Sequence, residues 1–484
     1  MQQLGLIVLA ALVVGVLAWT LIGNGPAVQR AAEVAAGGVA AAPPAVKTPS
    51  ESTANEGQAA ATEKEAVDAQ AEPDEGAAAA DEDQDGAGAQ AADAEATPVV
   101  SSDGSILVGE LPFSKYLNSR ELTALGIKDR DLSQTKYRAN LDLNFLMSGG
   151  PPPDGIPSID EPRFVTPEVA DAWLTDEALV IGFQYDGITR AYPVGILNFH
   201  EIVNDTFNGT RVSITFCPLC NSSVAFLAPE IDGEFTTFGT SGRLYLSDLV
   251  MYDRATATFW SQLEGRPIVG PLLGVIDSLQ RLPIDIMPYG PWKQAHPDTE
   301  VLARPREGDR VGRRIASGGM GKEKFLRDYT RDPYPSYKKR NPEKGGKTQF
   351  GIPVDDVRLK AKDGVVGVVV NGQPKAYAQA ATLERKLLND VVGDVPLLVV
   401  ATPAGGLKFF ERNVADSTLV FSLNDKGQLT DDQGNAWGFD GVATSGDLQG
   451  TQLKEIVATT SFWFAWISFN PTTELYTGDD QEQK

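Results

Sequence analysis

Cysteine and histidine are scarce in this chain of 484 residues, which has two of each. Two cysteines are far too few for a fold stabilised by disulfides. Basic residues are also in deficit, because Lys and Arg total 42 against 65 Asp and Glu, for a net charge of −23. This acidic balance, with no basic face that carries aromatic side chains, argues against nucleic acid as a partner.

Two common motifs of nucleotide binding and hydrolysis are missing. The Gly-rich segment at residues 318–323 lacks the spacing and the Ser or Thr of a phosphate-binding loop. The segment at residues 239–242 is not a nucleophile elbow. The remaining candidates for chemistry are the thiols and the imidazoles.

An internal repeat organises the second part of the chain. An Asx-Gly turn, an Ala-Tyr pair and an Asn-Asp pair occur around Gly187 and again, 185 residues later, around Gly372. Further on, Trp292 and Trp466 each stand four residues before a similar Pro- and Thr-containing turn. We expect the residues common to both copies to serve turns, caps and the core of a shared backbone.

The first copy has imidazoles and thiols where the second copy has other side chains. The aligned pairs are His200 with Arg385, His296 with Asn470, Cys217 with Ala401 and Cys220 with Ala404, the last two after a one-residue gap. Imidazoles and thiols are what a metal or redox centre needs. The residues found only in the first copy are therefore candidates for chemistry.

The chain begins with an apolar segment. Residues 4–22 are nineteen residues without a charge, long enough to cross a hydrocarbon core of about 30 Å as one helix. No Lys or Arg precedes them, which favours a retained membrane anchor over a cleaved signal peptide. From the acidic stretch that follows, we expect the folded part to lie outside the cytoplasm, in the periplasm or at the cell surface.

Residues 23–105 have the composition of a linker. They contain sixteen acidic residues against three basic ones and almost no large apolar side chains. Such a segment cannot bury enough apolar surface to offset its ordering entropy, so we expect it to be disordered.

The rest of the chain is long enough for two domains, and its many Gly and Pro residues favour short strands over long helices. We predict an α+β fold, mostly β, made of two related tandem modules. The first module, with the Cys/His site, covers residues 106–303, a polar connector covers 304–351, and a second, degenerate module covers 352–484. Helical spacing indicates a helix at residues 193–204.

Cys217 and Cys220 follow an apolar strand at residues 212–216. The second copy has a Gly-Gly pair at residues 405–406, followed by alternating aromatics, which is typical of a hairpin turn. We therefore expect the Cys pair at a hairpin tip, and not at the helix N-terminus that activates thioredoxin-like thiols. Thiols at this spacing can form a disulfide or share one metal ion.

Three functions stay open. In the first, Cys217 and Cys220 carry out thiol–disulfide exchange while His200 lowers a thiol pKa or shuttles a proton. In the second, His200 and His296 complete a tetrahedral set with both thiols for copper or zinc. In the third, the chain is a non-catalytic envelope scaffold. A purely structural disulfide would close too small a loop to stabilise the fold much.

Several segments together resemble a bacterial family, the domain of unknown function 3179. They lie at residues 154–160, 191–193, 200–205, 217–220, 247–254, 260–262, 296–299 and 332–337. The resemblance covers about residues 107–476. The family has no established activity, but possible selenoprotein members, with selenocysteine at the Cys pair, imply redox chemistry there. Thiol–disulfide exchange is therefore the first interpretation and metal binding the second.

Overall fold

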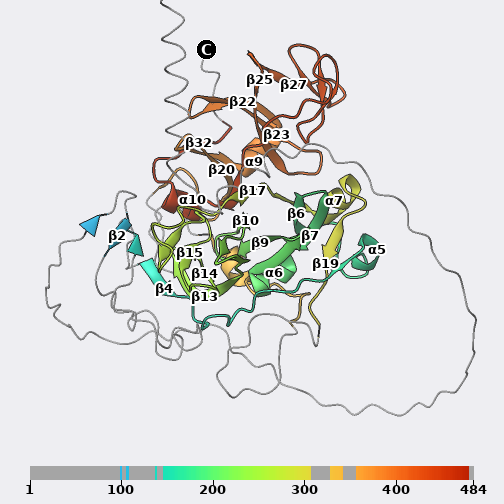
Figure 1. Cartoon of the computed structure of the whole chain (residues 1–484). Coiled ribbons are helices and arrows are strands. Elements are labelled where there is room, and N and C mark those ends of the chain that lie inside the picture. The colour runs from blue at the N-terminus through green and yellow to red at the C-terminus, as the bar shows by residue number, and fades with distance from the viewer. Residues whose placement is uncertain are drawn as a thin grey trace, which may run out of the picture. The chain divides into compact units, whose positions relative to one another are not determined.

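The computed structural model describes residues 145–306, 327–341 and 356–478, and the backbone of three short strands before them (Figure 1). Those strands are β1 (Val99–Val100), β2 (Ser105–Leu107) and β3 (Tyr137–Arg138). The predicted anchor at residues 4–22 and nearly all of the predicted linker at 23–105 lie outside the described residues. Within them, no helix has both the length and the apolar character needed to cross a bilayer.

The described part of the chain is mostly β, which confirms the predicted α+β class. Its longest helices are α6 (Val194–His200), α7 (Tyr289–Ala295), α9 (Gln379–Arg385) and α10 (Trp463–Phe469), each of seven residues. The predicted helix at 193–204 is shorter than expected. Glu201 adopts a left-handed backbone (φ 57°), which ends α6, and Asn204 lies in the next strand.

A five-stranded sheet begins the first half. Its strand order is β18-β6-β7-β19-β5, formed by β18 (Asp285–Pro288), β6 (Leu179–Tyr185), β7 (Ile188–Pro193), β19 (Glu300–Leu302) and β5 (Phe164–Val165). The hairpin between β6 and β7 turns through Asp186 and Gly187, both with positive φ, as the Asp-Gly pair predicted. The short helix α5 (Pro167–Ala170) follows β5.

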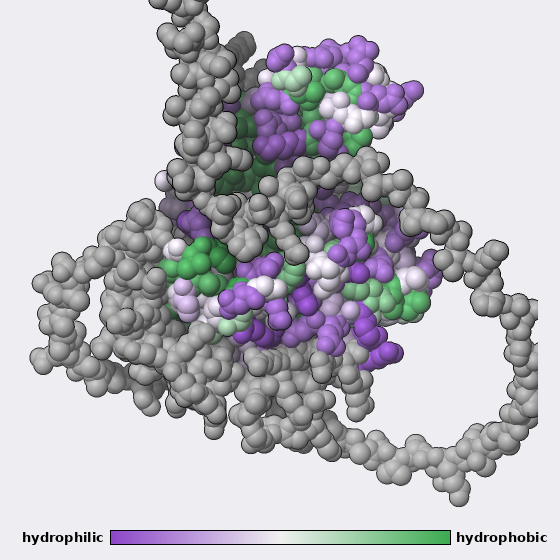
Figure 2. Space-filling view, in the orientation of Figure 1, coloured by the Kyte–Doolittle hydropathy of each residue, from purple (hydrophilic) through white to green (hydrophobic). Residues whose placement is uncertain are grey.

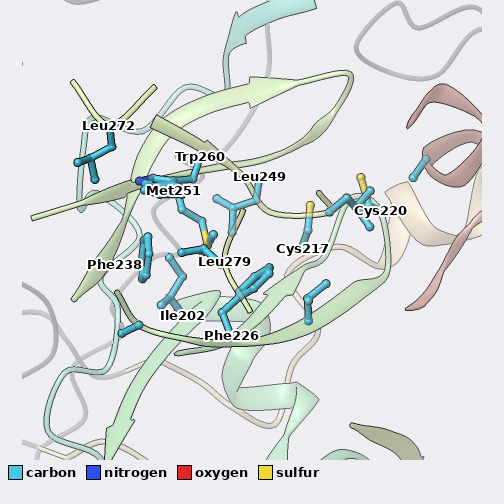
Figure 3. Close-up of a cluster of buried hydrophobic side chains, with 14 of the residues drawn as sticks. Ile202, Cys217, Cys220, Phe226, Phe238, Leu249, Met251, Trp260, Leu272 and Leu279 are labelled. Carbon is cyan, nitrogen blue, oxygen red and sulfur yellow. The ribbon is translucent and has the colours of Figure 1, made fainter. Parts of the chain in front are cut away.

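Two further sheets enclose a core between them. One has the order β17-β10-β9-β8, with β8 (Ile202–Phe207), β9 (Thr210–Cys217), β10 (Ser222–Leu227) and β17 (Arg281–Leu282). The other is eight-stranded and contains β4 (Leu146–Ser148), β13 (Phe238–Tyr245), β14 (Asp248–Asp253), β15 (Phe259–Ser261), β16 (Pro267–Val269) and β1 to β3. A small hairpin, β11 (Glu230–Ile231) with β12 (Glu234–Phe235), stands apart. The core between the sheets includes Met251, Trp260 and both cysteines (Figure 3).

The second half repeats the order of elements of the first. Six elements of the second half begin 185 residues after their counterparts β6, β7, α6, β8, β9 and β10. They are, in the same order, β20 (Gly364–Val370), β21 (Gln373–Ala378), α9, β22 (Leu387–Val392), β23 (Val395–Ala401) and β24 (Leu407–Glu411). Three later elements begin 174 residues after β18, α7 and β19. They are, in the same order, β31 (Thr459–Phe462), α10 and β32 (Glu474–Tyr476). The sheet order β31-β20-β21-β32 matches β18-β6-β7-β19, and β32 is parallel to β21 as β19 is to β7.

The remaining strands of the second half are short. They are β25 (Asn413–Val414), β26 (Ser417–Thr418), β27 (Phe421–Leu423), β28 (Leu429–Asp431), β29 (Ala436–Trp437) and β30 (Ala443–Ser445). On the face shown in Figure 2, hydrophilic residues predominate over this part, with smaller apolar areas between them.

Side chains common to both halves make the same contacts. Tyr192 donates a hydrogen bond to Asp205, and Tyr377 donates one to Asp390. The indole N–H of Trp292 donates to Thr299 at 3.0 Å, and that of Trp466 donates to Thr473 at 2.9 Å. These residues serve packing in both halves, as their presence in both copies predicted.

Part of the predicted polar connector packs on the first half. It contains the helix α8 (Pro335–Lys339). The Tyr329 hydroxyl lies 2.7 Å from His200 Nε2, and the Tyr337 hydroxyl donates to the carbonyl of Leu219 at 2.8 Å. This segment therefore covers both α6 and the turn between the two cysteines.

Candidate functional site

The Cys pair lies at the tip of a β-hairpin, as predicted. β9 ends at Cys217, which pairs in register with Ser222 at the start of β10. The turn closes through Asn221, whose φ is 49°. Both thiols are free and buried, and their sulfur atoms lie on the same side of the hairpin (Figure 3). From the second half, the amide of Phe462 donates to the Cys220 carbonyl at 2.7 Å and fixes the tip.

Asp248 joins the two thiols. The sulfur atoms of Cys217 and Cys220 and a carboxylate oxygen of Asp248 all lie within 4.8 Å of one another. Among the residues that the structure describes, no other cluster of three or more His, Cys, Asp or Glu side chains reaches this proximity. Two thiols and one carboxylate are a donor set that suits a metal ion.

A tight turn places Asp248. Leu246 and Ser247 connect β13 to β14, and both have left-handed backbones, with φ of 52° and 66°. Such a conformation is unfavourable by roughly 1–2 kcal/mol for each residue that is not glycine. Packing around the turn offsets this cost. The turn in this way holds Asp248, the first residue of β14, beside the thiols.

The Asp248 carboxylate is only partly satisfied. Oδ2 accepts a hydrogen bond from the amide of Leu263 at 2.9 Å, whereas Oδ1 has no hydrogen-bond partner among the described residues. Burial raises the pKa of Asp248 to about 8. An unpaired buried oxygen is costly, and native proteins usually provide it with a partner such as a proton, a water or a cation.

The thiol of Cys220 is held in its neutral form. Its Sγ lies 3.3 Å from the carbonyl oxygen of Ser247. Burial raises its pKa well above the ordinary value, and Cys217 and Asp248 raise it further. A cation between the sulfurs would favour the thiolates and reverse this effect.

A second buried carboxyl lies near the cluster. Burial first, and the charge of Asp248 second, raise the pKa of Glu201 to about 8. Its counterpart 185 residues later is Lys386, which is exposed and has the same left-handed backbone, with φ of 68°. The comparison of the two copies that singled out the cysteines would also have found Glu201.

Aromatic residues of the connector complete the surroundings. Burial raises the pKa of both Tyr334 and Tyr337, and the acidic groups near them raise it further. The Lys362 ammonium lies 3.3 Å from the centre of the Tyr337 ring and donates to the Tyr337 carbonyl. The sequence analysis placed Tyr334 and Tyr337 in a family-like segment of a polar connector, residues 304–351, and did not predict that they lie beside the thiols.

The structure does not bring His200 to the thiols. Its Nδ1 lies 2.8 Å from the carbonyl oxygen of Pro157, and its Nε2 lies 2.7 Å from the hydroxyl of Tyr329. Burial lowers the pKa of His200 to about 4, so the ring is neutral at neutral pH. With both nitrogens engaged, His200 ties the connector to α6, and it is not available as a ligand or a proton shuttle.

His296 also lies outside the cluster. It follows α7 and packs on Trp292, with ring centres 4.1 Å apart. Burial lowers its pKa, which the charge of Asp285 opposes. The predicted set of two Cys and two His is therefore not assembled. The structure brings the two thiols together with Asp248, and not with the imidazoles.

Comparison with known proteins identifies a family. A family model described as "Protein of unknown function (DUF3179)" matches residues 153–473, which is well over half of the chain. Comparisons with curated proteins and with solved structures gave no significant match. The matched range contains the Cys hairpin, Asp248, Glu201 and the described connector. The chain belongs to the DUF3179 family.

Proposed function

We propose that this protein binds one metal ion, zinc in the first place, through Cys217, Cys220 and Asp248. The observation that carries the proposal is the proximity of three donor atoms within 4.8 Å, all of them buried. Zinc binds sulfur at about 2.3 Å and carboxylate oxygen at about 2.1 Å, so donors around one tetrahedral ion lie roughly 3.3–3.8 Å apart. A small inward movement of the three side chains would close the site.

The donor set favours zinc over copper. Zinc accepts mixed thiolate and carboxylate ligands, whereas soft Cu(I) prefers sulfur alone. Three protein ligands leave the fourth position of a tetrahedral ion for a water molecule or a substrate, which is the arrangement of catalytic zinc sites. The unpartnered Oδ1 of Asp248 would gain a partner when the ion binds.

Metal binding should depend on pH. Zinc binds the deprotonated forms of its ligands, and burial raises the pKa of both Asp248 and Cys220. The ion therefore has to displace protons from the site. We expect the affinity to increase as pH rises from 6 to 8.

Elemental analysis tests the proposal directly. The full chain, produced without chelators, should contain about one zinc ion per molecule. Cys220→Ser should remove it, while Ala404→Ser, which places a serine in the corresponding turn of the second half, should leave it in place. A chain free of metal, with both thiols reduced and unable to take up added zinc, would exclude the site.

Thiol–disulfide exchange is the second candidate, favoured by the two free thiols within 4.8 Å of each other. In this reaction Cys217 and Cys220 would form an S–S bond and release two protons and two electrons, and a disulfide of a partner would take these up to become a dithiol. Reactive cysteines are usually partly exposed, and both of these are buried, which ranks this function second. A Cys220→Ser variant that still cycles between the two redox states would exclude it.

We also infer that the two halves are related tandem modules and that the second has lost the site. The common 185-residue spacing and the matching hydrogen bonds of Tyr192 and Tyr377 support this inference. For residues 4–22 we propose a membrane anchor that holds the folded part outside the cytoplasm. A chain that begins at residue 23 should then appear in the soluble fraction, and the full chain in the membrane fraction.

A further inference from the structure

The outer edge of β8 in the first half is covered by the chain itself. Ile159 pairs with Val203 in a parallel bridge. The amide of Ile159 donates to the carbonyl of Ile202, and the amide of Asn204 donates to the carbonyl of Ile159, both at 2.8 Å. Asn204 Nδ2 also donates to Asp160 Oδ1 at 2.7 Å. An aliphatic residue followed by an acidic residue thus adds one short strand to this edge.

The corresponding edge in the second half belongs to β22. This strand pairs with β23 in the same register as β8 pairs with β9. In the first half, the backbone N–H and C=O groups of Ile202 and Asn204 face away from β9. Those of Leu387 and Asn389 therefore face away from β23. β22 is the outermost strand of its sheet, and among the described residues no segment pairs with its outer edge.

A hollow of about 490 Å³ lies at this edge. Its lining residues are Arg385, Lys386, Leu387, Leu388, Asn389, Phe421, Ser422 and Leu423. Residues 385–389 and Phe421 correspond, at the 185-residue spacing and by their place in the fold respectively, to residues 200–204 and Phe238, all of which are buried in the first half. In the second half Arg385, Lys386 and Asn389 are exposed.

One side chain at this edge, that of Asn389, makes the same hydrogen bonds as Asn204 in the first half, whereas Arg254, which pairs with Asp160 at 3.1 Å, has the acidic counterpart Asp432. Asn204 exchanges two hydrogen bonds with the backbone of Phe238, and Asn389 exchanges the same two with the backbone of Phe421. The second N–H of the Asn204 amide donates to Asp160. Asn389 carries an equivalent N–H, and Arg385 and Lys386 add positive charge beside it.

We propose that the edge of β22 is a binding site for an extended segment of a partner protein, in which an aliphatic residue is followed by an acidic residue. The segment would add as a parallel strand, donate its aliphatic amide to the Leu387 carbonyl, and accept from the Asn389 amide. Its carboxylate would lie near Asn389, Arg385 and Lys386. This proposal is independent of the metal centre.

A labelled peptide with the sequence of residues 156–162 of this chain is the probe, because residues 158–160 form the covering segment of the first half. Fluorescence anisotropy with the full-length protein should give a dissociation constant on the order of 10–100 μM. The protein variants Arg385→Glu and Lys386→Glu should weaken binding at least tenfold. Lys426→Glu, an exposed change elsewhere in the second half, should not alter it.

Changes in the peptide separate strand addition from general charge attraction. N-methylation of the residue equivalent to Ile159 removes the backbone donor and should abolish binding, and Asp160→Lys should also abolish it. The proposal fails if the unmodified peptide does not bind at about 1 mM. It also fails if the N-methylated peptide binds equally well or if Lys386→Glu has no effect in a protein with unchanged melting temperature.

Discussion

The substitution Glu201→Gln should change the pH dependence of stability in a defined direction. Glutamine keeps the size of the side chain and the positive φ at this position, and removes only the ionisable group. Burial, together with the charge of Asp248, raises the pKa of Glu201 from an ordinary value of 4.5 to about 8. The folded protein therefore favours the protonated form. Its stabilising contribution is complete below pH 4.5 and is lost as pH rises to 8.

The size of the effect follows from the shift. At about 1.4 kcal/mol for each pKa unit, ionisation of Glu201 costs the folded state on the order of 4–5 kcal/mol at pH 8. Relative to the native protein, the variant should gain about this much between pH 4 and pH 8. At pH 4 we expect it to be equal or slightly less stable, since a buried amide needs new hydrogen bonds.

Urea unfolding of the reduced, metal-free protein, followed by tryptophan fluorescence between pH 4 and pH 8, measures this difference. Glu230→Gln, a change of the same kind at an exposed position of β11, is the control and should follow the native curve at every pH. If Glu201→Gln and the native protein gave parallel curves, the carboxyl would be solvated, and the description of a buried acidic cluster would be wrong.

Three further results are expected. Asp248→Asn should weaken zinc binding about 100-fold, as measured by competition with a chromophoric chelator, because a charged ligand is replaced by a neutral one. His200, whose depressed pKa of about 4 favours the neutral ring, should destabilise the folded state by about 3 kcal/mol as pH falls from 6.5 to 4, so His200→Gln should gain about this much relative to the native protein over that range in urea titrations. Tyr337→Phe removes the hydrogen bond to the Leu219 carbonyl and should cost about 1 kcal/mol and speed the reaction of the thiols with a disulfide reagent.

Local parts of the site could be predicted from the sequence. The strand before Cys217 and the Gly-Gly turn in the second copy indicated a hairpin tip, and the structure has the pair there. The repeat also identified which Tyr, Asp and Trp residues serve the common backbone. These inferences depend on contacts between residues that lie near one another in the sequence or recur at a fixed spacing.

The cluster of Cys217, Cys220 and Asp248 could not be predicted, because it depends on contacts between distant segments. Asp248 reaches the thiols only through the pairing of β13 with β14 and the left-handed turn at Leu246 and Ser247. Tyr337 lies 118 residues beyond Leu219, to which it donates. Neither contact leaves a periodic or spacing signal in a single sequence.

The comparison of the copies was misleading for His296. The amide of His296 donates to the Trp292 carbonyl at the end of α7, and the amide of Asn470 donates to the Trp466 carbonyl at the end of α10. The two residues thus hold the same place at a helix end, where different side chains are tolerated. A difference between the copies indicates chemistry only when the side chain faces other reactive groups, and that depends on the fold.

Native mass spectrometry of the full chain, purified without tags or chelators, tests the central claim most directly, since one spectrum reports both bound metal and thiol state. Binding by Cys217, Cys220 and Asp248 predicts a mass greater by one zinc ion, and after acid release a chain with both thiols reduced. A metal-free chain two hydrogens lighter than the reduced form would show a disulfide between the cysteines and would contradict a metal centre.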